Sequence, residues 1–202
     1  MNEGETVVVS KSHRALRAVN TLTLLGGIGL LTLSVWPGFV IGCFLSLAYP
    51  AIALLGLAWL LIVIRAVPKP YGRGTPIPLL QILIAPIMVC STYALLKFYI
   101  PRRIAFVAHI SQFEQRLTSA ATTTQPIALN RWLGIYRVDQ IRHDIRGGVY
   151  FRTGIGADGI DQMSCGFVHQ PNPEGSPFGR KYYIYRPLAG DWYWFEASDD
   201  YY

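Results

Sequence analysis

The first half of this chain contains a long run without any charged side chain. No Asp, Glu, Lys or Arg occurs between Arg17 and Arg65, and only 15% of the 202 residues are charged, against about a quarter in soluble domains. A helix rises about 1.5 Å per residue and a bilayer core is about 30 Å thick, so one span needs about 20 residues. The uncharged run is long enough for two spans, and the sequence therefore predicts a membrane protein.

The scarcity of ionisable side chains in the apolar segments and of cysteine limits the possible functions and structures further. The apolar segments lack the ionisable side chains that mark most ion pathways and substrate sites in membranes, which disfavours transport by this chain alone. Cys43 and Cys90 lie in apolar segments and only Cys165 lies in the polar half, so that half cannot hold an internal disulfide. The apolar run also exceeds the roughly 7 to 15 residues of the apolar region in a cleavable signal peptide, which favours a retained anchor.

The net charge of +6 is unevenly distributed along the chain. Up to Arg103 there are nine basic residues and two acidic ones, whereas from residue 104 onward there are nine basic and ten acidic residues. The positive charge thus flanks the apolar segments, where it acts as a topology signal. Nucleic-acid binding is disfavoured, because no basic patch with interleaved aromatic residues remains.

Proline and glycine divide the apolar region into spans. The uncharged run has two candidate breaks, Trp36-Pro37-Gly38 and Tyr49-Pro50, and we prefer the first. The preferred break predicts a basic tail over 1–17 and membrane helices over about 18–35, 39–66 and 75–97, with Pro50 as a kink in the second. Counting two spans instead of three would return the C-terminal part to the side of the N-terminus.

The Lys and Arg residues of the short flanks predict the orientation. With a cytoplasmic N-terminus, the tail and the 65–76 loop place six basic residues inside, and Lys97, Arg102 and Arg103 lie outside. Six against three favours an extracytoplasmic C-terminal domain. The Arg102-Arg103 pair directly after the third span argues the other way.

The segment 101–126 is expected to form an amphipathic helix and a linker. Apolar residues recur at helical spacing after Pro101, and a Thr/Ala-rich stretch follows; the apolar residues are Phe106, Ile110, Phe113 and Leu117. The helix would lie on the bilayer or cover one face of the domain that follows.

Residues 127–202 have the pattern of a small antiparallel β-domain. Aromatic and β-branched runs alternate with Gly and Pro, which predicts strands over 133–141, 148–153, 162–169, 181–186 and 191–197 in a sequential meander. In the last strand, Trp192 and Trp194 face one side while Tyr193 and Phe195 face the other. A strand that is aromatic on both faces lies between two layers or presents one face to a partner.

One glycine-rich segment resembles two kinds of ligand site, each only in part. The sequence Gly154-Ile-Gly-Ala-Asp-Gly159 fits G-x-G-x-x-G, but no helix is expected to open at its third glycine, so a long hairpin connection explains it better than a dinucleotide site. Asp158 and Asp161 lack the twelve-residue calcium pattern with its terminal Glu, so they indicate turn chemistry.

Cys165 and His169 are the candidates for catalysis or metal binding, together with His143 and Asp144. On one strand, residues four apart share a face but lie about 13 Å apart, too far for shared ligation without a bulge. We therefore predict no catalytic residues, cofactor or metal. The alternative is a membrane-associated enzyme with a site around Asp158, Asp161, Cys165 and His169.

The expected function is that of a membrane-anchored, non-enzymatic binding or interaction module, such as an accessory subunit of a membrane complex. Its partners would be the bilayer and a protein that contacts the β-domain. The candidate interaction surface consists of Trp192, Trp194, Tyr201 and Tyr202, although a final core strand followed by an acidic tip is the slightly favoured explanation of this ending. Gly38 and Gly42, like Gly26, Gly27 and Gly29, would let membrane helices approach closely.

Overall fold

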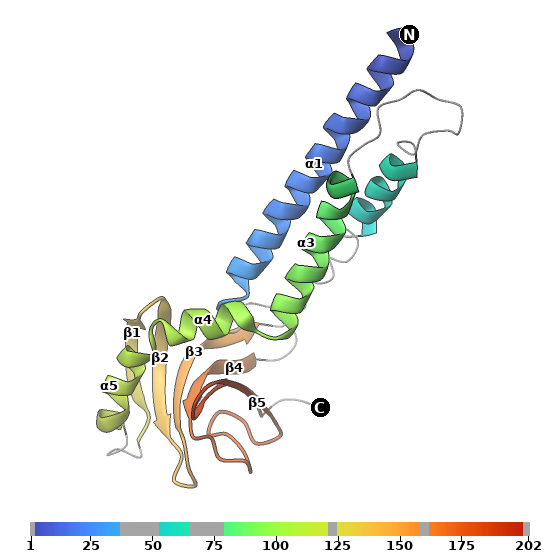
Figure 1. Ribbon diagram of the computed structural model, residues 1–202. Helices are drawn as coiled ribbons and strands as arrows, with labels where there is room; N and C mark the ends of the chain where they lie inside the picture. The colour runs from blue at the N-terminus through green and yellow to red at the C-terminus, as the bar shows by residue number, and fades with distance from the viewer. Residues whose placement is uncertain (1–2, 37–52, 65–78, 121–124, 158–161, 200–202) are drawn as a thin grey trace. The chain divides into compact units, whose positions relative to one another are not determined.

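The computed structural model describes residues 3–36, 53–64, 79–120, 125–157 and 162–199 (Figure 1). The chain divides into two compact units, each considered by itself. The helical unit consists of residues 1–32 and 44–98, and the β unit consists of residues 33–43 and 99–202.

The helical unit contains two long apolar helices. Helix α1 (Glu3–Leu33) holds an apolar stretch at Arg14–Leu33, and α3 (Leu79–Lys97) holds another at Leu80–Lys97. Both stretches are long and apolar enough to cross a membrane. Since α1 already begins at Glu3, most of the predicted 1–17 tail is helical.

The predicted second span, 39–66, is not confirmed. Its described part is the shorter apolar helix Ala53–Ile64, and its remainder lies outside the described residues, as do Pro50, Gly38 and Gly42. Of the three predicted spans, two therefore correspond to helices of sufficient length within the described ranges.

Helices α1 and α3 run in the same direction. The amide Nδ2 of Asn20 donates to the carbonyl of Gln81 at 3.0 Å, and farther along both helices Gly27 faces Thr92. A Cβ atom at Gly27 would lie 2.8 Å from the Thr92 hydroxyl oxygen, so glycine permits this close approach. Both residue numbers increase together between the two contacts, which is the pattern of parallel helices.

The β unit is built on a six-stranded antiparallel sheet with the order β1-β2-β3-β4-β6-β5. Its strands are β1 (Ile127–Leu133), β2 (Tyr136–His143), β3 (Val149–Ala157), β4 (Gln162–His169), β5 (Tyr182–Ala189) and β6 (Trp192–Ser198). The antiparallel sheet was predicted correctly.

Two details of the predicted strands are wrong. The order is not a sequential meander, because β6 pairs with β4 and displaces β5 to the edge. The predicted first strand, 133–141, joins parts of two strands, because Gly134 adopts a φ of 63° and turns the chain between β1 and β2.

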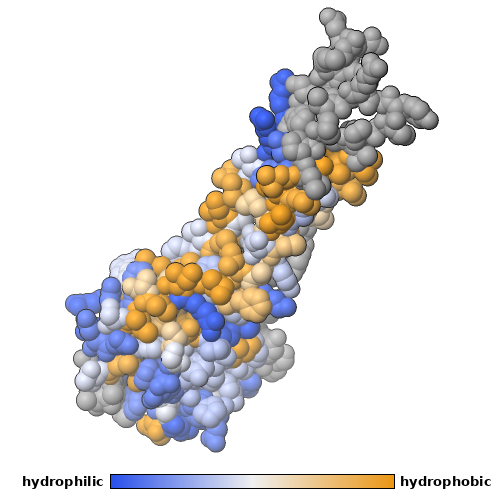
Figure 2. Space-filling view, viewed as in Figure 1, coloured by the Kyte–Doolittle hydropathy of each residue, from blue (hydrophilic) through white to orange (hydrophobic). Residues whose placement is uncertain are grey.

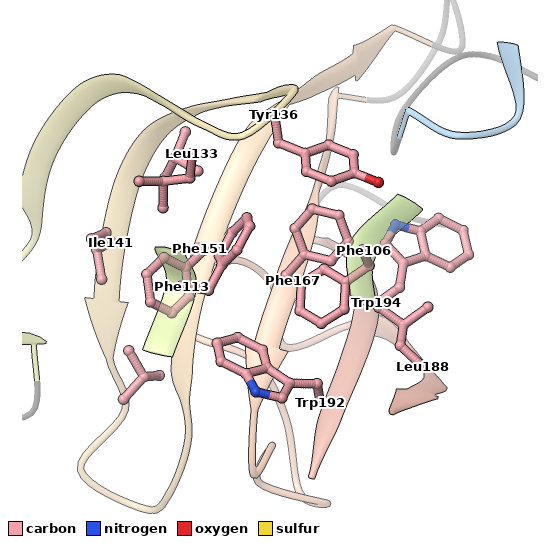
Figure 3. Packing of buried hydrophobic residues seen from close by; sticks show 12 residues of the cluster. Phe106, Phe113, Leu133, Tyr136, Ile141, Phe151, Phe167, Leu188, Trp192 and Trp194 are labelled. Carbon is pink, nitrogen blue, oxygen red and sulfur yellow. The ribbon is translucent and has the colours of Figure 1, made fainter. Parts of the chain in front are cut away.

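Two helices cover one face of the sheet. The predicted amphipathic helix occurs as α4 (Ile100–Val107) and α5 (Ile110–Ala120), separated at Ala108 and His109. Phe106 and Phe113 are fully buried, as the periodicity predicts, and lie among aromatic residues of the sheet (Figure 3). This core contains Leu133, Tyr136, Val138, Ile141, Val149, Phe151, Phe167, Leu188, Trp192 and Trp194.

The other face is covered by the chain between β4 and β5. Phe178 from this segment stacks on Phe195 at 5.7 Å between ring centres, beside buried Tyr150 and Val168. The hydroxyl groups of Tyr150 and Tyr185 lie 2.9 Å apart, and both donate toward the carbonyl of Gly175. Both faces of β6 are thus covered by parts of the same chain.

Candidate functional site

The tryptophans of the predicted interaction surface belong to the core. Trp192 and Trp194 are each 3% exposed, because alternate residues of β6 point toward α4 and α5. These two side chains therefore offer no open surface to a partner. Tyr201 and Tyr202 lie outside the described residues.

The residues of the enzyme alternative do not form a described site. Cys165 is 1% exposed and its Sγ donates to the carbonyl of Gly154 at 3.4 Å, whereas His169 contacts the Trp192 ring at 5.1 Å between centres. Asp158 and Asp161 lie outside the described residues. Within the described ranges, no three His, Cys, Asp or Glu side chains gather as metal ligands would.

The glycine-rich motif lies largely on a strand. β3 continues through Gly154 and Gly156 to Ala157, which pairs with Gln162 of β4. A dinucleotide site would need a helix at this point, so the antiparallel pairing agrees with the predicted hairpin connection.

A buried arginine is the most unusual feature of the β unit. Arg102 lies on the inner side of α4 and is 3% exposed. Its guanidinium carbon lies 3.9 Å from the centre of the Trp194 ring, and its Nε donates to the carbonyl of Ser34 at 3.2 Å. Stacking on an aromatic face, together with a hydrogen bond, partly offsets the cost of removing the charge from water.

A second arginine shares the same aromatic rings. The guanidinium carbon of Arg186, on β5, lies 4.8 Å from the Tyr99 ring and 5.6 Å from the Trp194 ring. Tyr99 precedes α4 with a φ of 55°, and its ring centre lies 6.0 Å from that of Trp194. We call this set of side chains the arginine–aromatic cluster; it consists of Tyr99, Arg102, Arg186 and Trp194.

The electrostatics of the cluster follow from its burial. Burial lowers the pKa of Arg102, and the nearby negative charge of Glu196 opposes that effect. An arginine pKa starts so high that the group stays protonated. Burial also raises the pKa of Tyr136, although the positive charge of Arg102 counteracts it.

Several buried hydrogen-bond donors of this region lack a partner among the described residues. They are Nη1 of Arg102, Nε of Arg186, Nε1 of Trp194 and the hydroxyl of Tyr136. Figure 3 shows the Tyr136 hydroxyl directed toward the side of the core on which the Trp194 indole nitrogen lies. Such a donor-rich region suits oxygen acceptors, including carboxylates, phosphates and water.

A shallow cleft of about 590 Å³ lies elsewhere on the β unit. It is lined by His143, Asp144, Ile145, Arg146, Ser176, Pro177, Gly179, Arg180 and Asp199. Asp144 forms an ion pair with Arg146 at 2.8 Å, and Asp199 accepts a hydrogen bond from the backbone of Arg180. Its carboxylates therefore already bind groups of the same chain.

Sequence reasoning treated Arg102 as a topology signal and did not identify the cluster. The available signal was spacing, since Arg102 lies four residues before Phe106 on the same helical stripe. Comparisons of the chain with protein-family models, curated proteins and solved structures find no match.

Proposed function

We propose that this protein is a membrane-anchored, non-enzymatic interaction module whose β-domain binds a protein partner, as an accessory subunit of a membrane complex would. The observation that carries the proposal is the hydrogen bond between Arg102 and Ser34. Ser34 directly follows α1, and Arg102 lies five residues after the end of α3. Within the β unit, this bond joins the segment that follows α1 to the segment that follows α3.

The parallel direction of α1 and α3 supports three spans. Two parallel helices that both cross a bilayer require the chain between them to cross back. The apolar helix Ala53–Ile64 lies in that connecting stretch, and its Trp59 Nε1 donates to the carbonyl of Ile82 on α3 at 3.1 Å. We therefore propose that the return crossing passes through this helix.

An odd number of spans puts the two chain ends on opposite sides of the membrane. The excess of Lys and Arg in the N-terminal tail and the 65–76 loop favours a cytoplasmic N-terminus. The β-domain then faces the extracytoplasmic side, where its partner would bind.

The topology can be tested with tags at both ends of the full chain. Protease added outside intact cells should remove a C-terminal tag and leave an N-terminal tag untouched until the membrane is permeabilised. A third tag in the 65–76 loop should behave like the N-terminal one. Protection or cleavage of both terminal tags together would contradict the odd span count.

The interaction role requires a separate experiment. The detergent-solubilised full chain should capture one or more membrane proteins that a chain lacking residues 127–202 does not capture. Identical sets of captured proteins would show that the β-domain contributes no binding.

A further inference from the structure

Helix α4 has an inverted distribution of charge and apolar side chains. The inner side carries Arg102, which is 3% exposed, together with Phe106. The opposite side carries Ile104 and Val107, which are 66% and 49% exposed. A helix at a protein–water boundary normally shows the reverse arrangement, with its charge outside.

The exposed side of α4 is a continuous apolar stripe. At 100° per residue, Ile100, Ile104, Val107 and Ala108 fall on the side opposite Arg102. Figure 2 shows apolar residues gathered on the surface over α4, next to hydrophilic ones. Arg103 borders the stripe, and its Nε donates to the carbonyl of Pro187 at 3.3 Å. We call Ile100, Ile104, Val107 and Ala108 the outer stripe.

The position of α4 along the chain identifies what covers the outer stripe. Only Phe98 and Tyr99 separate α4 from Lys97, the last residue of α3. Three Cα–Cα steps span at most about 11 Å, and the headgroup layer at each surface of a bilayer is roughly 5 to 8 Å thick. If α3 crosses the membrane, α4 begins in or next to that layer.

The residues that follow α1 support the same environment independently. Trp36 is 38% exposed and comes three residues after Leu33, the last residue of α1. Its indole Nε1 donates to the carbonyl of Ile135 at 3.3 Å, so it is held against the β unit. Tryptophan at this distance from a span is typical of the membrane interface.

We propose that the outer stripe of α4 lies in the lipid interface of the bilayer, with Ile104 and Val107 inserted among the acyl-chain ends. This inference rests on the proposed membrane anchoring and adds a specific lipid-binding surface on the β unit. An interfacial helix of this kind buries its apolar side about 5 to 10 Å into the headgroup and acyl boundary. Anionic lipids strengthen the contact through Lys97 and Arg103.

Spin labels on the full chain in vesicles test the proposal. Single cysteines replace Ile104, Val107 or Ile145 in a chain whose Cys43 and Cys90 are serine, while Cys165 remains because it is buried. Ile145, 82% exposed at the turn between β2 and β3, is the matched control. The vesicles contain phosphatidylcholine and phosphatidylglycerol, and the collision rates of each label with oxygen and with a water-soluble nickel chelate are measured.

Labels at 104 and 107 should favour oxygen over the nickel chelate several-fold more than the label at 145. A water-exposed label at 104 on protein that floats with the vesicles would overturn the lipid contact while leaving the anchoring intact. Shielding of the 104 label from both reagents would also overturn it, because a protein would then cover the stripe. Protein that fails to float with the vesicles would overturn the anchoring itself.

Discussion

The guanidinium carbon of Arg102 lies 3.9 Å from the centre of the Trp194 ring, in the core between α4 and β6. The Nε of the same side chain donates a hydrogen bond to the carbonyl of Ser34, which follows α1. One residue of α4 thus contacts both the sheet and the segment that leaves the first apolar helix. A charge that is 3% exposed is costly unless it is stacked and bonded. The consequences of this and other contacts can be measured.

Arg102→Ala should destabilise the folded β unit by about 2 kcal/mol, because it removes a desolvated cation–π contact and a charged hydrogen bond. Arg103→Ala is the matched control. Arg103 also bonds to a carbonyl, but it is only partly buried, so we expect less than about 1 kcal/mol. Thermal unfolding of the full chain in detergent measures both, and equal shifts in melting temperature would contradict a special role for Arg102.

Gly134→Ala should be far more damaging than Gly190→Ala. Both glycines adopt a left-handed conformation, with φ values of 63° and 53°, which costs alanine about 1 kcal/mol. A Cβ atom at Gly134 would in addition collide with the ring of His109, whereas nothing lies within 4 Å at Gly190. We expect the collision to add about 2 kcal/mol. Similar denaturation midpoints for the two variants would refute the close approach of His109, which precedes α5, to the β1–β2 turn.

Gly27→Leu should weaken the packing of α1 against α3. The added side chain meets Thr92, and overpacking of this kind costs about 1 to 3 kcal/mol. Gly26→Leu is the control, because a Cβ atom there meets nothing within 4 Å. The melting temperature in detergent should fall for the first variant and stay near that of the wild type for the second. Loss of stability in both would indicate a different packing of the two helices.

Asp144→Asn should reduce stability in a pH-dependent way. Burial opposes ionisation of this carboxylate, but hydrogen bonds from the backbone and side chain of Arg146 outweigh it and hold the pKa of Asp144 below its ordinary value of 3.8. A pKa lowered by folding stabilises the protein above the ordinary value, and the benefit disappears as the pH falls through the folded value. The stability difference from wild type should therefore be largest near pH 7 and shrink below about pH 4. Urea unfolding at a series of pH values measures it, and a constant difference would disprove the linkage.

Local patterns in the sequence determined much of the architecture. The absence of charge from residue 18 to residue 64 and the run before Lys97 indicated apolar helices, because a bilayer selects for length and apolar composition alone. The spacing of Phe106 and Phe113 indicated which side of the helix segment faces a core. Alternation in β6 indicated that Trp192 and Trp194 share one face. All three features depend on residues close together in the chain.

Tertiary structure alone decided the rest. The insertion of β6 between β4 and β5 depends on which strands pair after the 170–181 connection, and no local period encodes that choice. The role of Arg102 was hidden for the same reason. An arginine after a span usually serves as a topology signal, and only its contacts with Ser34 and Trp194, each more than sixty residues away, turn it inward. Because Arg102 points into the core, the opposite side of α4 is the one left apolar and exposed. The directions of the two sides of one helix are fixed together.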